Sequence, residues 1–363
     1  MKTLPWIAAA LPWCFIVWIG APRGHDLPLE LIRLAEYQRA LRDLQLPPYW
    51  ATHLYAGFGS PIFLFYGHVC LLLASLLAWI AGSLVIGLLL ALSLATLIAV
   101  IGLQGAGSSW SASSQPSAAG RVASYLFVLN PYLIGDAFLR NASAEYVALC
   151  GMPIGLYGLA LTAREPRRAL RFLAIGTAWV SAAHNLSALS WLAIASALIF
   201  VDSDRSARLR RVEGLAFGIA LAAFAWLPAL RWKPLIQSEQ LLTGKFDFHS
   251  KFLAWSNMFG DHFASVGPLP LMAAVLALIA LRRATAPERT LMQRLLALAV
   301  GTIVLQMRVS IPLWEHSGVL PYFQFPFRFM GPFALVTALL GGLAFARITD
   351  RFRSRTRRLL ELL

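Results

Sequence analysis

The sequence predicts an all-α membrane protein, a polytopic bundle of roughly ten transmembrane helices in a single domain that spans residues 1–363. Three observations carry this prediction. Hydrophobic residues make up 58% of the chain and charged residues only 13%, whereas soluble domains carry about 25% charged residues. Apolar segments of helical length recur, and arginine gathers in alternate loops between them. The net charge of +14 is therefore explained by membrane topology, and no nucleic-acid partner is expected.

The N-terminal part predicts one helix followed by a polar loop. After Lys2 the chain is apolar as far as Gly20 and shows no small-residue cleavage site, so we expect an uncleaved first helix that starts in the cytoplasm. Residues 21–61 are then predicted to be the first external loop. Within it, apolar residues at helical spacing over 27–44 predict an amphipathic helix at the membrane interface.

Three apolar stretches follow, at 62–80, 83–105 and 119–134. The first external loop and the segment just before residue 145 are both predicted to be external, so an even number of crossings must separate them. One stretch therefore does not cross fully. We expect 62–80 to lie in the outer leaflet or dip into it, because it follows Gly-Ser-Pro and carries His68.

The rest of the chain alternates between apolar segments and two kinds of loop. The apolar segments cover 145–163, 169–183, 186–201, 212–230, 267–281, 295–309 and 331–348. Arginines crowd every second loop and fill the tail at 349–363, which predicts that these parts and both termini are cytoplasmic. The interval 231–266 is predicted to be a long external loop. Its lysines among aromatic rings suit either a lipid phosphate or outer-leaflet headgroups.

Cysteine usage gives no sign of a disulfide framework or a zinc site. Cys14, Cys70 and Cys150 fall in apolar runs without metal-ligand spacing, so we expect packing residues. No cofactor is assigned. A divalent metal ion is left open, with Asp26 and Glu30 on adjacent helical turns as the only credible pair of oxygen ligands.

A series of motifs occurs in a fixed order along most of the chain. They are Gly24-His25-Asp26, Pro47-Pro48 with Trp50, Gly57 to Pro61 with Phe63 and Phe65-Tyr66, Asn130-Pro131-Tyr132, Asp136, Arg140, Ala144-Glu145, Pro153, His184-Asn185 and Gln324-Phe325-Pro326 with Arg328-Phe329. Together they resemble a bacterial multispanning family labelled 6-pyruvoyl-tetrahydropterin-synthase-related. That family is similar to GT-C superfamily glycosyltransferases. The resemblance implies a GT-C-like enzyme of the bacterial inner membrane that takes a sugar from a polyprenyl-phosphate donor on the extracytoplasmic face.

Two features depart from the family pattern. A His often stands four residues after the Asp of Gly-His-Asp, and here that position is Glu30. The donor is then expected to be handled differently, with Glu30 as a candidate substrate-binding residue. The chain also stops soon after its last predicted helix, without the external C-terminal domain of many relatives. Acceptor recognition is therefore expected to come from loops or from an envelope protein partner.

The resemblance places the catalytic carboxylate at Asp26, because an Asp in the first external loop is the usual catalytic residue of the superfamily. Its expected role is the general base that deprotonates the acceptor, with His25 as an orienting neighbour. The alternative is structural, since Asp26 also stands where it could cap the amphipathic helix. Glu145 is a candidate second acid.

Cations are needed to offset the charge of the departing phosphate. Arg140 is predicted to clamp that phosphate, with Glu145 or Asp136 as its partner; the alternative is a salt bridge at the membrane edge. Arg328 and Gln324, in a motif rich in aromatic rings, are candidate hydrogen-bond donors to the carrier phosphate. The alternative for Arg328 is that its side chain extends to the lipid headgroups. His184 is a further candidate, with a structural hydrogen bond as the alternative.

Three functions from different classes remain. The first is the transferase. The second is a transporter for a lipid-linked saccharide, which would place ionisable groups near the bilayer midplane in repeated halves. No internal repeat is present and the charges lie at helix ends, which favours the enzyme. The third is a scaffold subunit of an envelope assembly without chemistry of its own, because fold does not fix function.

Overall fold

The structure is a computed structural model that describes residues 10, 14, 24–161, 165–200, 204–254 and 266–361. Over these residues the fold is all-helical, and β pairing is limited to isolated bridges between Ala51 and Ser60 and between Leu253 and Met307. The predicted all-α class is confirmed for this part of the chain. The expected first helix lies almost wholly outside the described residues.

The segment predicted to be the first external loop, residues 21–61, contains the predicted amphipathic helix, α2 (Leu27–Arg42). Pro28 stands in its first turn, where a missing N–H costs nothing. Two short helices follow, α3 (Ile62–Phe65) and α4 (His68–Ala81), and Gly82 ends α4 in the left-handed conformation. At 14 residues, α4 is shorter than a full span, and its position in the outer leaflet stays a prediction.

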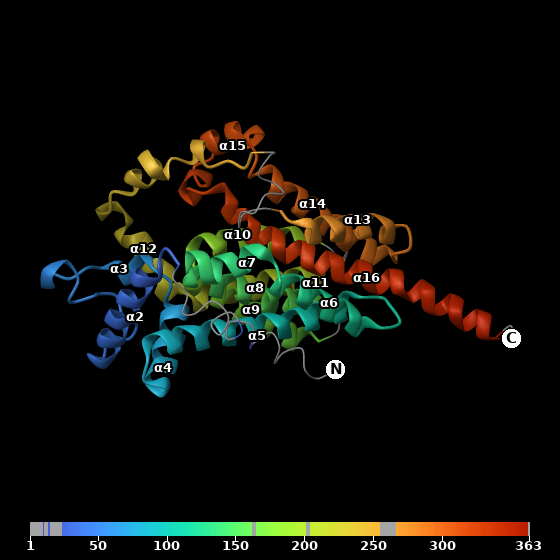
Figure 1. Cartoon of the computed structure of the whole chain (residues 1–363), viewed down its shortest axis with the longest axis horizontal. Coiled ribbons are helices and arrows are strands. Elements are labelled where there is room, and N and C mark those ends of the chain that lie inside the picture. The colour runs from blue at the N-terminus through green and yellow to red at the C-terminus, as the bar shows by residue number, and fades with distance from the viewer. Residues whose placement is uncertain are drawn as a thin grey trace.

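Two long helices, α5 (Leu84–Trp110) and α8 (Ser143–Leu161), form the centre of the bundle. Their backbones approach closely at Gly102 of α5, where an added Cβ would lie 2.5 Å from the carbonyl carbon of Pro153. The last helix, α16 (Met330–Glu361), packs with its apolar half buried in the same core. The helices α9 (Pro166–Ala183), α10 (Asn185–Ile199), α13 (Pro268–Leu281) and α14 (Ala286–Val304) surround them (Figure 1).

One predicted span is broken. The apolar stretch 212–230 predicts a single helix, but α11 (Arg205–Leu221) and α12 (Ala223–Trp232) meet at an angle of 65°. The break is stabilised by substitute hydrogen bonds. Trp226 Nε1 donates to the Ile219 carbonyl at 2.9 Å. Pro228 supplies no N–H, and the carbonyl of Phe224 four residues earlier accepts instead from the Tyr49 hydroxyl at 2.8 Å.

A second bend lies next to the candidate site. The predicted stretch 119–134 forms α6 (Pro116–Val128) and α7 (Pro131–Gly135), followed by the π-helical turn η2 (Asp136–Arg140). The two parts are bent by 43°. Asn130 caps α7, because its side chain accepts a hydrogen bond from Tyr132 N at 2.9 Å. The bend is thus fixed by a cap and a proline.

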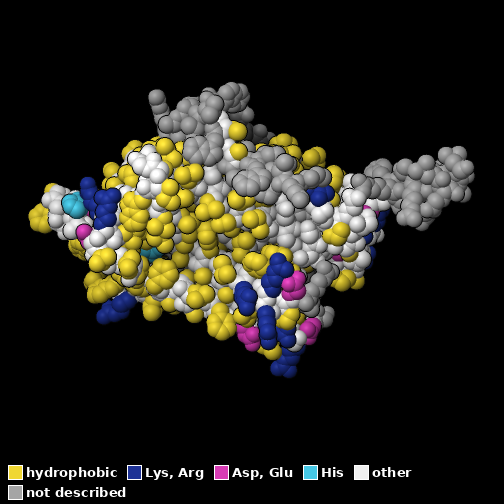
Figure 2. Space-filling view, turned by 90° about the horizontal axis from the view of Figure 1, so that it is seen from below, with side chains coloured by type: hydrophobic (Ala, Val, Ile, Leu, Met, Phe, Trp, Pro, Cys, Tyr) yellow, Lys and Arg dark blue, Asp and Glu magenta, His cyan; other side chains and the backbone are white. Residues whose placement is uncertain are grey.

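Within the described residues, three helices are long and apolar enough to cross a membrane, or up to five if each bent pair is one span. These are α5, α8 and the first part of α16. The protein is therefore a helical membrane protein, and roughly ten crossings stay a prediction. Figure 2 shows apolar side chains over the broad middle of one face, with lysines and arginines on its left and in a group along its lower edge.

The arginine-rich end is held together by two acids, of which Glu288 is buried. Arg347 of α16 forms an ion pair with Glu288 at the start of α14. Asp350 accepts hydrogen bonds from Ser113 Oγ at 3.0 Å and Ser114 Oγ at 2.6 Å. These contacts place the α5–α6 loop, the start of α14 and the middle of α16 together (Figure 1). The predicted cytoplasmic side of these segments stays a prediction.

The opposite end carries an arch of short helical turns. It runs through turns η3 to η6 (residues 233–250) and continues after α14 in η8 (Arg308–Ser310), α15 (Ile311–His316), η9 (Leu320–Phe323) and η10 (Pro326–Phe329). A cluster of buried rings holds the arch together; it comprises Phe248, Phe252, Trp314, Phe323 and Phe329. The arch therefore has its own small core beside that of the bundle.

Candidate functional site

The first external loop docks against the turn η2. His25 N donates to the carbonyl of Leu139 at 3.1 Å, and Asp26 N donates to the carbonyl of Arg140 at 3.0 Å. These two backbone bonds bring together segments that lie more than a hundred residues apart in the sequence. They place the candidate acid beside the candidate phosphate-binding arginine.

Gly24 makes this close approach possible. A Cβ on Gly24 would lie 1.9 Å from Asn141 Oδ1 and 2.7 Å from the carbonyl oxygen of Leu139. Asn141 is itself fixed, since its backbone is left-handed with φ at 56° and its Nδ2 donates to the carbonyl of Ala137 at 2.9 Å. The Gly of the Gly-His-Asp motif is thus explained by packing.

The half-buried Asp26 stands at the N-cap position of α2, but its side chain makes no capping hydrogen bond. The structural alternative raised by the sequence therefore does not describe this carboxylate. Its negative charge acts on Glu30 and Arg33 of α2 and on Asp136 of η2. Asp26 is thus within electrostatic reach of both walls of the site.

Arg140 bridges two buried carboxylates. Its Nη1 forms a short ion pair with Asp136 Oδ1, and its Nη2 lies 3.4 Å from Glu145 Oε2. Tyr132 joins the cluster, because its hydroxyl donates to Glu145 Oε1 at 2.6 Å and accepts from Arg140 Nη1 at 3.3 Å. The salt bridge that the sequence left as an alternative is therefore present, and it lies at the point where the first external loop docks.

Arg328 reaches the same carboxylate from the other side. Its Nε lies 3.6 Å from Glu145 Oε2, and its Nη1 donates to the carbonyl of Phe323 at 2.9 Å. In the described part of the chain, this Nε has no hydrogen-bond partner. Both guanidinium contacts to Glu145 are longer than an ordinary hydrogen bond. Two cations thus flank one carboxylate without being tightly bound to it.

His184 caps α10 and lies in the field of this cluster. Its Nδ1 is 2.8 Å from Ser187 Oγ. Burial lowers the pKa of His184 to about 4, and the charge of Glu145 only partly opposes this effect. The ring is therefore neutral at pH 7. Its contacts are those of the structural alternative, at a position next to the ionic cluster.

Glu30 is buried in a cluster of its own on α2. Its Oε1 lies 2.8 Å from Arg33 Nη1 and accepts a short hydrogen bond from the Tyr66 hydroxyl, while Oε2 has no partner among the described residues. Burial raises the pKa of Glu30 above its ordinary value, against the bonds from Tyr66 and Arg33. The described residues contain no group of three or more His, Cys, Asp or Glu side chains that could hold a metal ion.

The two remaining predicted residues, His25 and Gln324, lie at the edges of the ionic cluster. His25 is exposed beside Asp26, and among the described residues it makes no contact that would orient the acid beyond the backbone bond already described. Gln324 is buried at a left-handed position, φ 63°, in the turn that carries Arg328. Its role in binding stays a prediction.

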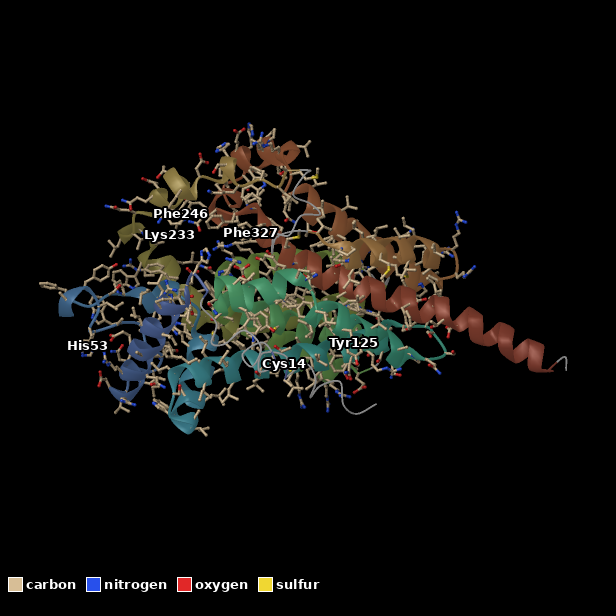
Figure 3. The ribbon with its side chains drawn as sticks, in the orientation of Figure 1. Cys14, His53, Tyr125, Lys233, Phe246 and Phe327 are labelled. Atoms are coloured by element: carbon tan, nitrogen blue, oxygen red, sulfur yellow. The ribbon has the colours of Figure 1, made fainter. Side chains whose placement is uncertain are left out.

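Aromatic rings and lysines border the cluster on the arch side. The ring of Phe327 lies 5.0 Å from the Arg140 guanidinium and stacks on Phe325, whose ring is 6.5 Å from that of Phe246. Lys233 lies over the ring of Tyr322 at 5.0 Å. Figure 3 shows Lys233 and Phe246 near Phe327, with His53 apart on the first external loop.

Three contributors were not assigned from the sequence. Tyr132 bonds Glu145 and Arg140, and Arg33 with Tyr66 surrounds Glu30. Tyr132 had a signal, since it stands in the Asn130-Pro131-Tyr132 motif. Tyr66 also had one, since it ends the motif that begins at Gly57. Arg33 had none, because its place beside Glu30 depends on how α2 packs against the chain after α3.

Comparisons with known proteins bear on the fold. No family model and no curated protein matches the chain. Among solved structures, the chain is similar to the arabinofuranosyltransferase AftD from mycobacteria, with a TM-score of 0.54 and 16% identity. The match covers 96% of this chain and 26% of that one, so this chain spans about a quarter of the length of its structural relative. The likeness shows a fold shared with that structure, and it gives no support to the narrower 6-pyruvoyl-tetrahydropterin-synthase-related label.

Proposed function

We propose that the protein is a membrane glycosyltransferase that moves a sugar from a polyprenyl-phosphate donor to an acceptor hydroxyl on the extracytoplasmic face of the bacterial inner membrane. The observation that carries the proposal is the docking of the Asp26 backbone on Arg140 at 3.0 Å, with Arg328 on the far side of Glu145. A half-buried carboxylate that makes no capping hydrogen bond and two arginines at one end of a membrane bundle suit this reaction. The GT-C-like fold agrees with it.

The proposed reaction assigns one task to each group. Asp26 accepts the proton of the acceptor hydroxyl while the hydroxyl oxygen attacks the anomeric carbon of the donor sugar. The bond between that carbon and the phosphate oxygen breaks, the phosphate leaves with the electron pair, and the configuration inverts. Arg140 and Arg328 offset the charge that develops on the leaving phosphate. Asp136 and Tyr132 hold Arg140 in place, and Glu145 spaces the two guanidinium groups.

The proposal is tested by sugar transfer in membranes that contain the full chain. The structural relative AftD is an arabinofuranosyltransferase, so a polyprenyl-phosphate arabinofuranose is the first donor to assay. We expect Asp26→Asn and Arg140→Ala each to reduce the transfer rate by at least about 100-fold, in the range that general-base and electrostatic losses produce. Asp43→Asn is the matched control, because Asp43 is an exposed acid at the other end of α2.

Normal transfer by both site variants would remove this site from the mechanism. No transfer by the wild-type chain from any polyprenyl donor would favour the scaffold function, in which an envelope protein partner performs the chemistry. The assay therefore separates the enzyme from its strongest competitor.

A further inference from the structure

The hairpin between α2 and α3 ends in a turn that presents two aromatic rings to the outside. This turn, residues 54–59, is called the hairpin tip below. Tyr55 is 76% exposed and Phe58 is 87% exposed, and Trp50 beside the tip is 44% exposed. Large apolar side chains that gather on a surface in this way indicate a binding site.

The tip holds its rings on a fixed backbone. At its base, Ala51 and Ser60 exchange two backbone hydrogen bonds at 2.8 and 2.9 Å. Tyr55 is left-handed, with φ at 52°, a conformation that few residues other than glycine adopt. A Cβ on Gly59 would lie 2.2 Å from Trp50 Nε1, so the indole packs against the turn. A tip fixed in this way loses little conformational freedom when it binds a ligand.

Two hydrogen bonds attach the hairpin to the elements near the candidate site. His53 N donates to Glu36 Oε2 of α2 at 2.9 Å, and the Tyr49 hydroxyl donates to the carbonyl of Phe224 of α12 at 2.8 Å. Asp26 stands at the start of α2, and Glu36 lies roughly 15 Å farther along at about 1.5 Å per residue. The tip is therefore too far from Asp26 for a single sugar to touch both, but an oligosaccharide can span the distance.

The size and the position of the tip favour a glycan over a protein or a lipid. Two rings on one turn cover far less than the about 800 Å² per partner that a stable protein interface buries. Figure 1 shows the hairpin at the far left, opposite the C-terminal end of α16, and this end lies away from the broad apolar middle seen in Figure 2. A sugar has a face of C–H groups and a rim of hydroxyls, which suits an aromatic ring that is exposed to water.

We propose that the hairpin tip binds the acceptor, and that this acceptor is a polysaccharide. Its reacting end lies at Asp26, and sugars farther along the chain stack on Tyr55 and Phe58. The inference rests on the proposed function and specifies the class of its acceptor. Because the two rings do not touch the reacting atoms, they raise the affinity for long acceptors and leave the chemical step unchanged.

The test measures glycan binding to the purified full chain in phosphatidylcholine nanodiscs without any donor. The probes are linear octasaccharides of arabinofuranose and of β-linked glucose, each compared with its disaccharide. Stacking on a C–H face tolerates different sugars, so both octasaccharides should bind more tightly than the disaccharides. Removing both rings in the double variant Tyr55→Asn, Phe58→Ala should weaken octasaccharide binding about tenfold.

The substitutions are matched to the backbone. Asn accepts the left-handed conformation at position 55, and Phe58 has helical dihedral angles that Ala also adopts. Phe58→Trp keeps a ring and should retain wild-type affinity. Ile80→Ala is the control, because Ile80 is 83% exposed on α4 and lies outside the tip.

Three results would overturn the inference. They are wild-type affinity in the folded double variant, no octasaccharide binding by the wild-type chain, and quenching of the added Phe58→Trp fluorescence by brominated lipids, which would place the tip in the bilayer. The binding assay contains no donor, so its result is independent of transfer. In the transfer assay, the double variant should raise KM for an octasaccharide acceptor, with kcat and transfer to the disaccharide unchanged. A chain that binds octasaccharide through these rings but transfers no sugar refutes the proposed function alone.

Discussion

Replacing Gly24 with Ala tests whether the docked first loop sets the position of Asp26, the proposed general base. The new Cβ would lie 1.9 Å from Asn141 Oδ1 and 2.7 Å from the Leu139 carbonyl oxygen, whereas ordinary contact begins at 3.4 Å. Asn141 cannot move without a large energetic cost, because it is 2% exposed and its Nδ2 donates a hydrogen bond to the carbonyl of Ala137. The Leu139 oxygen belongs to the backbone. The loop itself must therefore move outward, by the order of 1 Å.

The displacement has two measurable costs. It weakens the backbone bonds of His25 and Asp26 to the η2 turn, each worth about 0.5–1.5 kcal/mol, so about 1–3 kcal/mol of stability is at stake. It also moves the Asp26 carboxylate, and a misplacement of about 1 Å costs about 100-fold in rate. We therefore expect kcat for sugar transfer to fall far more than the stability loss explains.

The assay pairs thermal unfolding of the purified chain with kcat per folded molecule. Gly318→Ala is the control, because a Cβ on Gly318 meets no atom within 4 Å and the residue lies on the arch, away from the docked loop. Adding Asn141→Gly to the Gly24 variant should restore part of the activity, since it removes the closest clash at a left-handed position that glycine accepts. Lower stability with unchanged kcat would show that the docked loop has a structural role only and does not position the Asp26 carboxylate.

Other perturbations give separate tests. Arg140→Gln leaves two buried acids without their shared cation and should destabilise the fold by about 3–5 kcal/mol; an unchanged melting temperature would contradict the buried cluster. Because burial lowers the pKa of His184 to about 4 from 6.5, the stability it contributes is present above pH 6.5 and lost as pH falls toward 4. The melting temperature of His184→Asn should therefore depend less on pH over this window than that of the wild type. Hydrogen bonds to Asp247 and Glu315 raise the pKa of His249, so its contribution is full below pH 6.5 and lost as pH rises through the higher folded-state value. Amide exchange over residues 244–253 should accelerate with that rise beyond the intrinsic base-catalysed trend; no excess would remove this contact as a stabiliser of the arch.

The sequence is most informative where one physical requirement dominates. Apolar length locates α5, α8 and the first part of α16, because a helix in hydrocarbon must satisfy its own backbone. It locates helix ends poorly. The stretch 295–309 predicts a span, but α14 runs from Ala286 to Val304, since hydropathy stops at Arg294 while the helix continues past it. The break at Ala222 escapes prediction for a related reason, as 212–230 is apolar throughout and its substitute bonds come from Trp226 and Tyr49.

The sequence likewise predicts some features of the candidate site and misses others. Membrane parity and motif order place Asp26 on the same side as Arg140, and the structure joins their backbones. The pairing of Glu30 with Tyr66 and the bridge from Tyr132 to Glu145 could not be predicted. Both depend on the packing of helices whose angles no local pattern specifies. Ionisable residues could be identified one by one, but their partners required the fold.

The proposed phosphate site explains why acids and cations lie so close together at one end of a membrane bundle. A site that must receive a phosphate needs cations that are held in place before the phosphate arrives, and buried cations without counter-charges are costly. Asp136 meets that need for Arg140 through a close ion pair. Glu145 meets it for both arginines at 3.4 and 3.6 Å, distances longer than an ordinary hydrogen bond, so both guanidinium groups can also donate to a phosphate oxygen. Under the proposed function, cations that are already in place favour binding of the carrier phosphate without a large rearrangement, and the Asp26 carboxylate, whose backbone is held by the η2 turn, serves the acceptor.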